Sequence, residues 1–247
     1  LAGETLATFR QSTSLARASR ILNLEIEIHP TVMPEGNPWM NYYAARFAWG
    51  DAGADLYRSL GMTPHHTSAS RIEAPHFVEI RGEDERTAIL CAGPPYQSRV
   101  DMRMLDTLLI TAGETQTRFN LAVGVGLTHP MHGALSMMSP FPVVESPEPT
   151  LASSWLFHID AKNIVATAWR EIVEDGKLVG FRVRLLETAG RHTQATLQSF
   201  RPIDSAKHVT FIGSVLSELR VEYDVMHLDL TRYEWAEIEA RFSDELA

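Results

Sequence analysis

Short runs in which apolar and polar residues alternate are the feature that most limits the folds open to this chain. Between positions 21 and 29, apolar residues Leu22, Leu24, Ile26 and Ile28 alternate with polar ones. A period of two with one polar face is the pattern of a β-strand that is buried on one side. Similar runs recur between Pro, Gly and acidic turn residues, and no helical period repeats between them. The pattern predicts an all-β protein built from layered antiparallel sheets.

The same pattern locates the other strands. We expect them at 44–49, 77–80, 87–90, 102–110, 119–127, 155–159, 164–169, 178–186, 193–200, 208–212, 219–223, 226–230 and 235–242. A helix fits the last of these segments almost as well. Turn chemistry at 81–86 and at Glu174-Asp175-Gly176-Lys177 predicts two hairpins. Two segments are not expected to be strands: we expect a short helical turn at 55–60 and a loop at 64–68.

Composition excludes several classes of partner. The chain has 247 residues, enough for one large all-β domain or two smaller ones. A formal charge of −9 argues against nucleic acid, whose phosphates require a cationic face. No apolar run approaches the ~20 residues that span a bilayer, so a membrane partner is not expected. Cys91 is the single cysteine, which we expect to be a buried thiol because it cannot form an internal disulfide.

The segment from 130 to 150 is rich in Pro, Ser and Met and is the best candidate for a domain boundary. We therefore expect a large β-sandwich domain at 1–149. The strands at 150–247 either complete that sandwich or form a smaller one. His129 and His132 at the start of this segment are close enough to share a metal ion. Since Pro130 argues against a helix, a turn with two polar side chains is the simpler interpretation.

Aromatic residues are most concentrated between 37 and 51. They fill the core of a sheet or, alternatively, form a rim that faces a sugar, because flat aromatic faces and a guanidinium suit a pyranose ring. The candidate carbohydrate-binding residues are Trp39, Tyr42, Tyr43, Arg46 and Trp49, with Arg99 and Arg103 as rivals. Alternation along a strand places Tyr42 and Arg46 on the face opposite Tyr43, so the set cannot line one surface. Tyr42 and Arg46 are the expected rim pair.

The most specific sequence motif lies at 180–191, which reads Gly-Phe-Arg-Val-Arg-Leu-Leu-Glu-Thr-Ala-Gly-Arg. It resembles the strand that opens the terminal sandwich of glycoside hydrolase family 38, the α-mannosidases, where an Arg-Leu-x-Glu-x-x-Gly run occurs. Further segments follow in the order expected of such a domain, namely 203–206, 216–219, 228–230 and 233–235. Upstream, 41–49 and 103–109 are similar to the large sandwich that precedes it in bacterial members.

The resemblance implies a galactose-mutarotase-like supersandwich with a smaller C-terminal β-sandwich. In the family, the nucleophilic Asp and the Zn²⁺ ligands lie in a preceding α/β barrel, and no family catalytic residue can be carried onto a position here. The chain is then expected to be a noncatalytic C-terminal part with no cofactor of its own. Its implied partners are the catalytic domain of the same polypeptide, upstream of Leu1, and carbohydrate. A first residue that is not Met fits this expectation.

Two other classes of function stay open. A freestanding carbohydrate-binding or aldose-mutarotase-like domain would need an acid and a base facing a pocket, commonly Glu and His. The candidates for that chemistry are His76, His129, His132, Glu79 and Glu145. The other class is an interaction domain whose large sheets serve assembly into a homo-oligomer.

Overall fold

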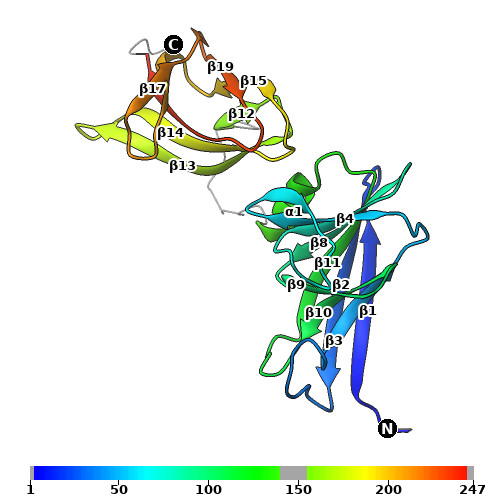
Figure 1. The fold of residues 1–247 in the computed structure, drawn as a ribbon. Coiled ribbons are helices and arrows are strands. Elements are labelled where there is room, and N and C mark those ends of the chain that lie inside the picture. The colour runs from blue at the N-terminus through cyan, green and yellow to red at the C-terminus, as the bar shows by residue number, and fades with distance from the viewer. Residues whose placement is uncertain (1–2, 140–154, 244–247) are drawn as a thin grey trace. The chain divides into compact units, whose positions relative to one another are not determined.

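The computed structural model describes residues 3–139 and 155–243 (Figure 1). Residue contacts divide the chain into two compact units, 1–141 and 142–247. Strands dominate both units and every pairing is antiparallel, so the all-β prediction is confirmed. The expected boundary at 149/150 lies outside the described residues.

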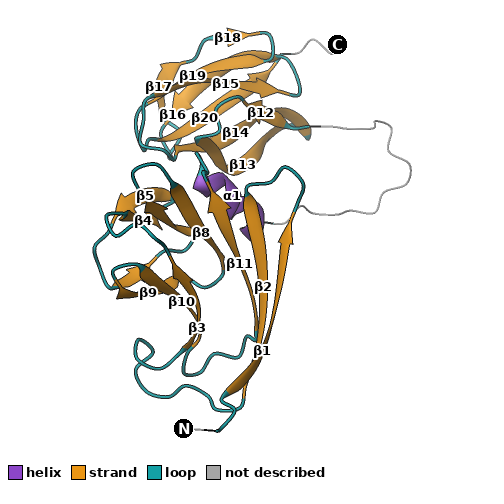
Figure 2. Ribbon diagram, turned by 90° about the vertical axis from the view of Figure 1, so that its right-hand side faces the viewer, coloured by secondary structure: helices purple, strands orange, loops and turns teal. Residues whose placement is uncertain are grey.

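The first unit contains two sheets (Figure 2). The seven-stranded sheet has the order β1 (Ala7–Leu15), β2 (Ile21–Pro30), β11 (Arg118–Val125), β8 (Arg86–Ala92), β7 (Phe77–Arg81), β4 (Asp55–Leu60), β5 (Thr63–His66). The four-stranded sheet has the order β3 (Tyr43–Ala48), β10 (Met104–Ile110), β9 (Tyr96–Asp101), β6 (Arg71–Glu73). We call these the large sheet and the small sheet.

Apolar side chains from both sheets form the core of this unit. Ile26 and Leu121 of the large sheet are buried together with Leu109 of the small sheet, as the alternation along each strand requires. Cys91 is fully buried and accepts a hydrogen bond from Gln97, and its burial raises the pKa of the thiol to about 12. The prediction of a buried thiol is confirmed.

Two local predictions in this unit are wrong. The expected helical turn at 55–60 is strand β4, because pairing with β7 and β5 satisfies its backbone. The expected loop at 64–68 is largely strand β5. Gly61 and Met62 close the β4–β5 hairpin with φ values of 57° and 66°, the left-handed conformation that tight hairpin turns require.

A helix, α1 (Pro130–Met138), occupies the start of the segment that is the candidate domain boundary. The predicted turn at His129 and His132 is therefore wrong. Pro130 stands at the first helical turn, where a missing N–H costs nothing, so it starts the helix instead of preventing it. Met131 and Ala134 are buried against residues of β7 and β8, and this packing stabilises the short helix.

The second unit also has two sheets. The five-stranded sheet has the order β13 (Ile164–Glu174), β14 (Lys177–Glu187), β20 (Trp235–Phe242), β16 (Ile203–Val209), β17 (Val215–Glu218). The four-stranded sheet has the order β12 (Phe157–Ile159), β15 (Thr193–Ser199), β19 (Val225–Leu230), β18 (Val221–Glu222). The predicted β13–β14 hairpin is confirmed, with Asp175 and Gly176 at positive φ. The strand expected at 208–212 is wrong beyond Val209, where a turn that contains Gly213 leads into β17.

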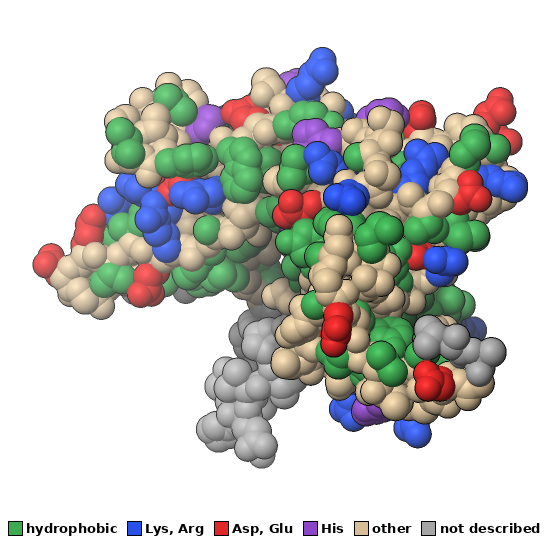
Figure 3. Space-filling view, turned by 60° about the horizontal axis from the view of Figure 1, so that its bottom comes forward, with side chains coloured by type: hydrophobic (Ala, Val, Ile, Leu, Met, Phe, Trp, Pro, Cys, Tyr) green, Lys and Arg blue, Asp and Glu red, His purple; other side chains and the backbone are tan. Residues whose placement is uncertain are grey.

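Ion pairs cross the outer face of the five-stranded sheet. The carboxylate of Glu237, 2% exposed, pairs with Arg170 at 2.5 Å and with Arg184 at 2.8 Å. The Glu239 carboxylate pairs with Arg182 on the neighbouring strand. On the face of the molecule shown in Figure 3, Lys and Arg side chains are interspersed with Asp and Glu. Because positive charges on this sheet face are paired with carboxylates, it does not form a free cationic surface.

Candidate functional site

Tyr42 and Arg46 meet at a carboxylate on the outer face of the small sheet. Asp106, on the neighbouring strand β10, is 1% exposed. Its two oxygens accept hydrogen bonds from Arg46 Nε at 2.6 Å and Nη2 at 2.8 Å, and the Tyr42 hydroxyl donates at 3.1 Å. Such a bidentate pair fixes the plane of the guanidinium. The Arg46 side chain is nevertheless 58% exposed, so its remaining donors face solvent.

The strand register extends this cluster across the small sheet. Arg46 pairs with Asp106 on β10, Asp106 pairs with Ser98 on β9, and Ser98 pairs with Arg71 on β6. The four residues therefore form one row on one face. Burial and the neighbouring Asp106 carboxylate raise the pKa of Tyr42, so its hydroxyl stays a hydrogen-bond donor at neutral pH.

Trp39 covers the far end of this row. Its ring lies 5.5 Å from Arg71 Cζ and makes an edge-to-face contact with Tyr96, with ring centroids 5.9 Å apart. Trp39 is half-buried, whereas Tyr96 is 47% exposed. Aromatic rings beside guanidinium groups give an apolar face next to several N–H donors. We call Trp39, Tyr42, Arg46, Arg71 and Tyr96 the aromatic rim.

The structure does not bring the other predicted residues to the aromatic rim. Tyr43 points to the opposite face and donates its hydroxyl proton to backbone carbonyls. The Trp49 ring packs against the core, and its buried Nε1 has no hydrogen-bond partner among the described residues. Arg103 donates to the Gly50 carbonyl at 2.9 Å, and Arg99 donates to a carbonyl in its own hairpin.

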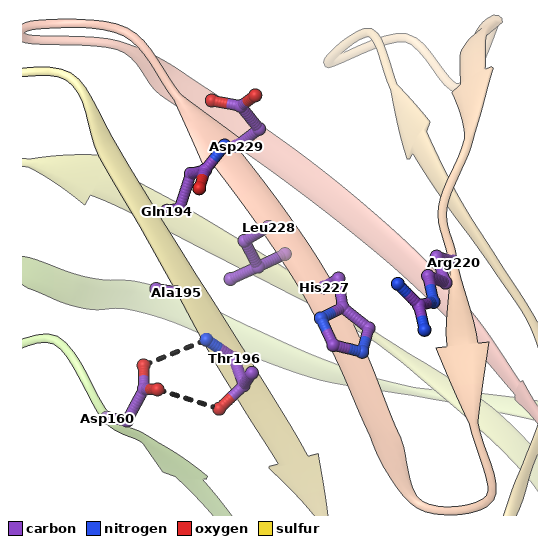
Figure 4. A pocket seen from close by; sticks show the side chains of 8 residues that line it. All are labelled: Asp160, Gln194, Ala195, Thr196, Arg220, His227, Leu228 and Asp229. Carbon is purple, nitrogen blue, oxygen red and sulfur yellow. Dashed lines mark hydrogen bonds between the residues drawn. The ribbon is translucent and has the colours of Figure 1, made fainter.

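A second candidate lies in the C-terminal unit, on the outer face of its four-stranded sheet (Figure 4). It is an open polar groove of about 400 Å³. Its lining residues are Asp160, Gln194, Ala195, Thr196, Arg220, His227, Leu228 and Asp229. Asp160 accepts hydrogen bonds from the backbone N–H and the hydroxyl of Thr196 at 2.8 and 2.9 Å, which holds one wall of the groove in place.

Part of this groove has unused hydrogen-bonding capacity. His227 Nε2 is buried without a hydrogen-bond partner in the described residues, although a Glu222 oxygen lies 3.6 Å away. Gln194 projects from β15 beside Asp229 in the register of the sheet. Sequence reasoning missed this groove because its side chains come from separate strands. Only the alternation along β15 and β19 signalled that they share a face.

The segment that carries the family resemblance has a structural role here. Glu187 is 0% exposed, and its carboxylate accepts hydrogen bonds from Asn163 Nδ2 and from the backbone N–H of Ala189, Gly190, Arg191 and Tyr233. Burial raises the pKa of Glu187, but these hydrogen bonds outweigh burial and the net pKa is lowered. Gly190, at φ 72°, faces the Tyr233 ring so closely that a Cβ would lie 2.4 Å from its hydroxyl oxygen. Glu187 and Gly190 thus hold a turn against a neighbouring loop.

The candidate residues for acid–base chemistry lie on different elements of the first unit or outside the described residues. Glu79 is buried and pairs with Arg81 at 2.7 Å. The ring of His76 is partly buried, which lowers its pKa, and its Nδ1 is buried with no hydrogen-bond partner among the described residues. His129 and His132 lie at the start of α1, whereas Glu145 lies outside the described residues.

Within 3–139 and 155–243, no group of three or more His, Cys, Asp and Glu side chains is placed to hold a metal ion. In the same part of the chain, no helix has the length and apolar character needed to cross a bilayer.

Solved structures provide the comparison for the whole chain, since no protein-family profile and no curated protein sequence matches it. A protein in glycosyl hydrolase family 38 from Enterococcus faecalis has a TM-score of 0.71 and 13% identity, over 95% of this chain and 30% of that one. An alpha-mannosidase from Enterococcus faecalis V583 has a TM-score of 0.69 and 12% identity, over 95% and 29%. The chain therefore has the fold of one part of these proteins and spans about 30% of their length.

Proposed function

We propose that this chain is the noncatalytic β-sandwich part of a larger glycosidase similar to the α-mannosidases. The observation that carries the proposal is the match over 95% of this chain to only 30% of a family 38 protein. The remaining part of such an enzyme would hold the catalytic residues and the zinc ion. The β-sandwich part would support the catalytic cleft and contact carbohydrate.

The buried carboxylates support a noncatalytic role. Hydrolysis of a glycosidic bond uses two carboxyl groups that face each other across a cleft, one of which must give up a proton. Here Asp106 is held by Arg46 and Tyr42, Glu187 by backbone N–H groups, and Glu237 by two arginines. For Glu187 and Glu237 these donors outweigh burial and lower the pKa, which disfavours the protonated form that a general acid needs.

Hydrolysis of an aryl α-mannoside in the presence of Zn²⁺ tests the proposal. Residues 1–247 alone are expected to give no turnover above the uncatalysed rate. Turnover that is lost when a carboxylate of this chain is changed to its amide would overturn the proposal. Circular dichroism of the same sample establishes that the chain is folded.

We further propose that carbohydrate contacts the aromatic rim. Trp39 and Tyr96 offer apolar faces for a sugar ring, and Arg46 and Arg71 have N–H donors for its hydroxyls. Methyl α-mannoside and a short mannose oligosaccharide would be titrated into ¹⁵N-labelled chain. Shifts of the Trp39 indole signal are expected, and Arg46→Lys should weaken them because a lysine cannot keep the bidentate contact with Asp106. Arg103→Lys, outside the rim, is the matched control and should leave the shifts unchanged.

A freestanding aldose-mutarotase-like domain is the second candidate. The partly buried His76 ring favours it, because its lowered pKa keeps a neutral base available at pH 7. The decay of optical rotation of freshly dissolved aldoses, with and without the chain, separates the two proposals. Acceleration that His76→Gln abolishes would favour the second candidate over the first.

A further inference from the structure

The two sheets of the first unit are unequal, and the difference leaves part of the large sheet uncovered. Phe9 and Ile28 are register partners on the same face of β1 and β2. Ile28 is 6% exposed under the small sheet, whereas Phe9 is 75% exposed, and Leu15 on the same face is 62% exposed. A face that is buried in one strand and open in its neighbour shows where the covering layer ends.

A groove runs along this open face beside β3, the edge strand of the small sheet. It has a volume of about 310 Å³. Its lining residues are Ala7, Phe9, Gln11, Leu24, Ile26, Ile28, Tyr43, Ala44, Ala45, Arg46, Phe47 and Leu109. One end is held by the Tyr43 hydroxyl, which donates to the carbonyls of Leu6 at 2.8 Å and Val32 at 2.7 Å. The groove is therefore an ordered apolar channel flanked by a strand edge.

The edge of β3 that faces away from β10 has no strand partner among the described residues. A sheet edge of this kind carries unpaired N–H and C=O groups that can accept a further strand. Its sequence, Tyr-Ala-Ala-Arg-Phe-Ala, has no Pro and one charged side chain, Arg46. That guanidinium is turned to the outer face, toward Asp106. The edge thus has no proline, and its one charged side chain is turned away from the groove.

We propose that an extended segment from the remainder of the larger enzyme adds to the free edge of β3 and covers Phe9. The inference rests on the proposed function. Matched family 38 proteins have about 70% of their chain outside the part that corresponds to this one, which supplies such a segment. Strands in a sheet lie ~4.8 Å apart, so one strand beside β3 would lie over the exposed row of β1. Alternate apolar side chains of that strand would pack on Phe9, which lines the groove.

A second copy of this chain fits the groove less well. Pairing of two β1 edges would lengthen the large sheet, because β1 belongs to that layer. The exposed face of β1 would stay uncovered, since covering it requires a strand in the opposite layer. The covering strand must therefore lie in the layer of β3. We assign it to the part of the larger enzyme outside residues 1–247, and pairing with the β3 edge of a second copy is the alternative that the oligomeric state distinguishes.

Hydrogen exchange tests the inference, with residues 1–247 and the longer gene product compared under identical conditions. The β3 amides that point to the free edge are expected to exchange at least about tenfold more slowly in the longer protein, because an added strand protects them. Phe9→Ser should leave the melting temperature of residues 1–247 unchanged and lower that of the longer protein. Arg10→Ser, on the opposite face of β1, is the matched control and should be neutral in both.

The outcomes separate this inference from the proposed function. Equal exchange of β3 in both proteins, with Phe9→Ser neutral in both, overturns the inference even where the longer protein hydrolyses an aryl α-mannoside. A dimer of residues 1–247 with protected β3 amides also overturns it, in favour of a second copy. A gene product without a glycosidase part overturns the proposed function and the inference together.

Discussion

Replacing Glu187 by Gln should strongly destabilise the C-terminal unit. One carboxylate oxygen accepts from Asn163 Nδ2 and Ala189 N, and the other accepts from the N–H groups of Gly190, Arg191 and Tyr233. A glutamine keeps one oxygen and places an NH₂ group where the second one was. At least two buried donors then lose their acceptor, at about 1–3 kcal/mol each. The expected loss in the free energy of unfolding is about 2–6 kcal/mol.

Urea unfolding measured by tryptophan fluorescence and circular dichroism tests this estimate, with the first unit as an internal reference. Glu218→Gln is the matched control, since Glu218 has a 67% exposed side chain and an ion pair with Lys207 at 3.3 Å. That change should cost less than about 0.5 kcal/mol. A Glu187→Gln value as small as the control would refute the reasoning.

The pH dependence gives an independent check on the same residue. Because the pKa of Glu187 is lowered in the folded state, its ionised form stabilises the fold at every pH above the ordinary value of 4.5. This contribution should be lost as the pH falls below 4.5 and through the lowered pKa. The stability difference between wild type and Glu187→Gln should therefore be constant near neutrality and shrink on acidification. A difference that grows on acidification would contradict the assignment.

Three further predictions follow from contacts in the two units. Gly180→Ala should cost about 2–4 kcal/mol of unfolding free energy, because the added Cβ would lie 2.2 Å from a carbonyl oxygen of β20. Gly50→Ala is the control and should be tolerated, because open space surrounds that position. Native Cys91, with a thiol pKa of about 12, should not react with a disulfide reagent at pH 8 until urea unfolds the first unit. Asp106→Asn should lower the pKa of the Tyr42 phenol, measured by its ultraviolet absorbance, because the neighbouring negative charge is removed; an unchanged pKa would argue against the contact.

The alternation of apolar and polar residues predicted many of the strands, because every second side chain of a strand faces the core. The strand at Leu22–Ile28 and the β13–β14 hairpin follow from period and turn chemistry alone. The sequence does not predict helix α1, because Pro130 disfavours the interior of a helix although it is well suited to a first turn. Strand β4 was missed because its stability comes from pairing with β5 and β7, which the local sequence does not show.

Of the candidate site, the sequence predicted Trp39, Tyr42 and Arg46, which all come from the stretch 37–51. Period two correctly placed Tyr42 and Arg46 on one face, opposite Tyr43. Their partner Asp106 lies 60 residues beyond Arg46 in the chain, and only the register of β3 with β10 brings the two together. Trp49 is an aromatic residue like Trp39 and Tyr42 of the rim, but its ring packs against the core. Side-chain type therefore identified the candidates, and the sheet register selected among them.

Glycosidase activity of residues 1–247, compared with that of the longer gene product, tests the central claim most directly. Both proteins would be assayed with an aryl α-mannoside and Zn²⁺ at equal concentration. We expect turnover by the longer protein and none by residues 1–247, although both are folded. Equal turnover by the two proteins would contradict it, because the catalytic groups would then belong to this chain.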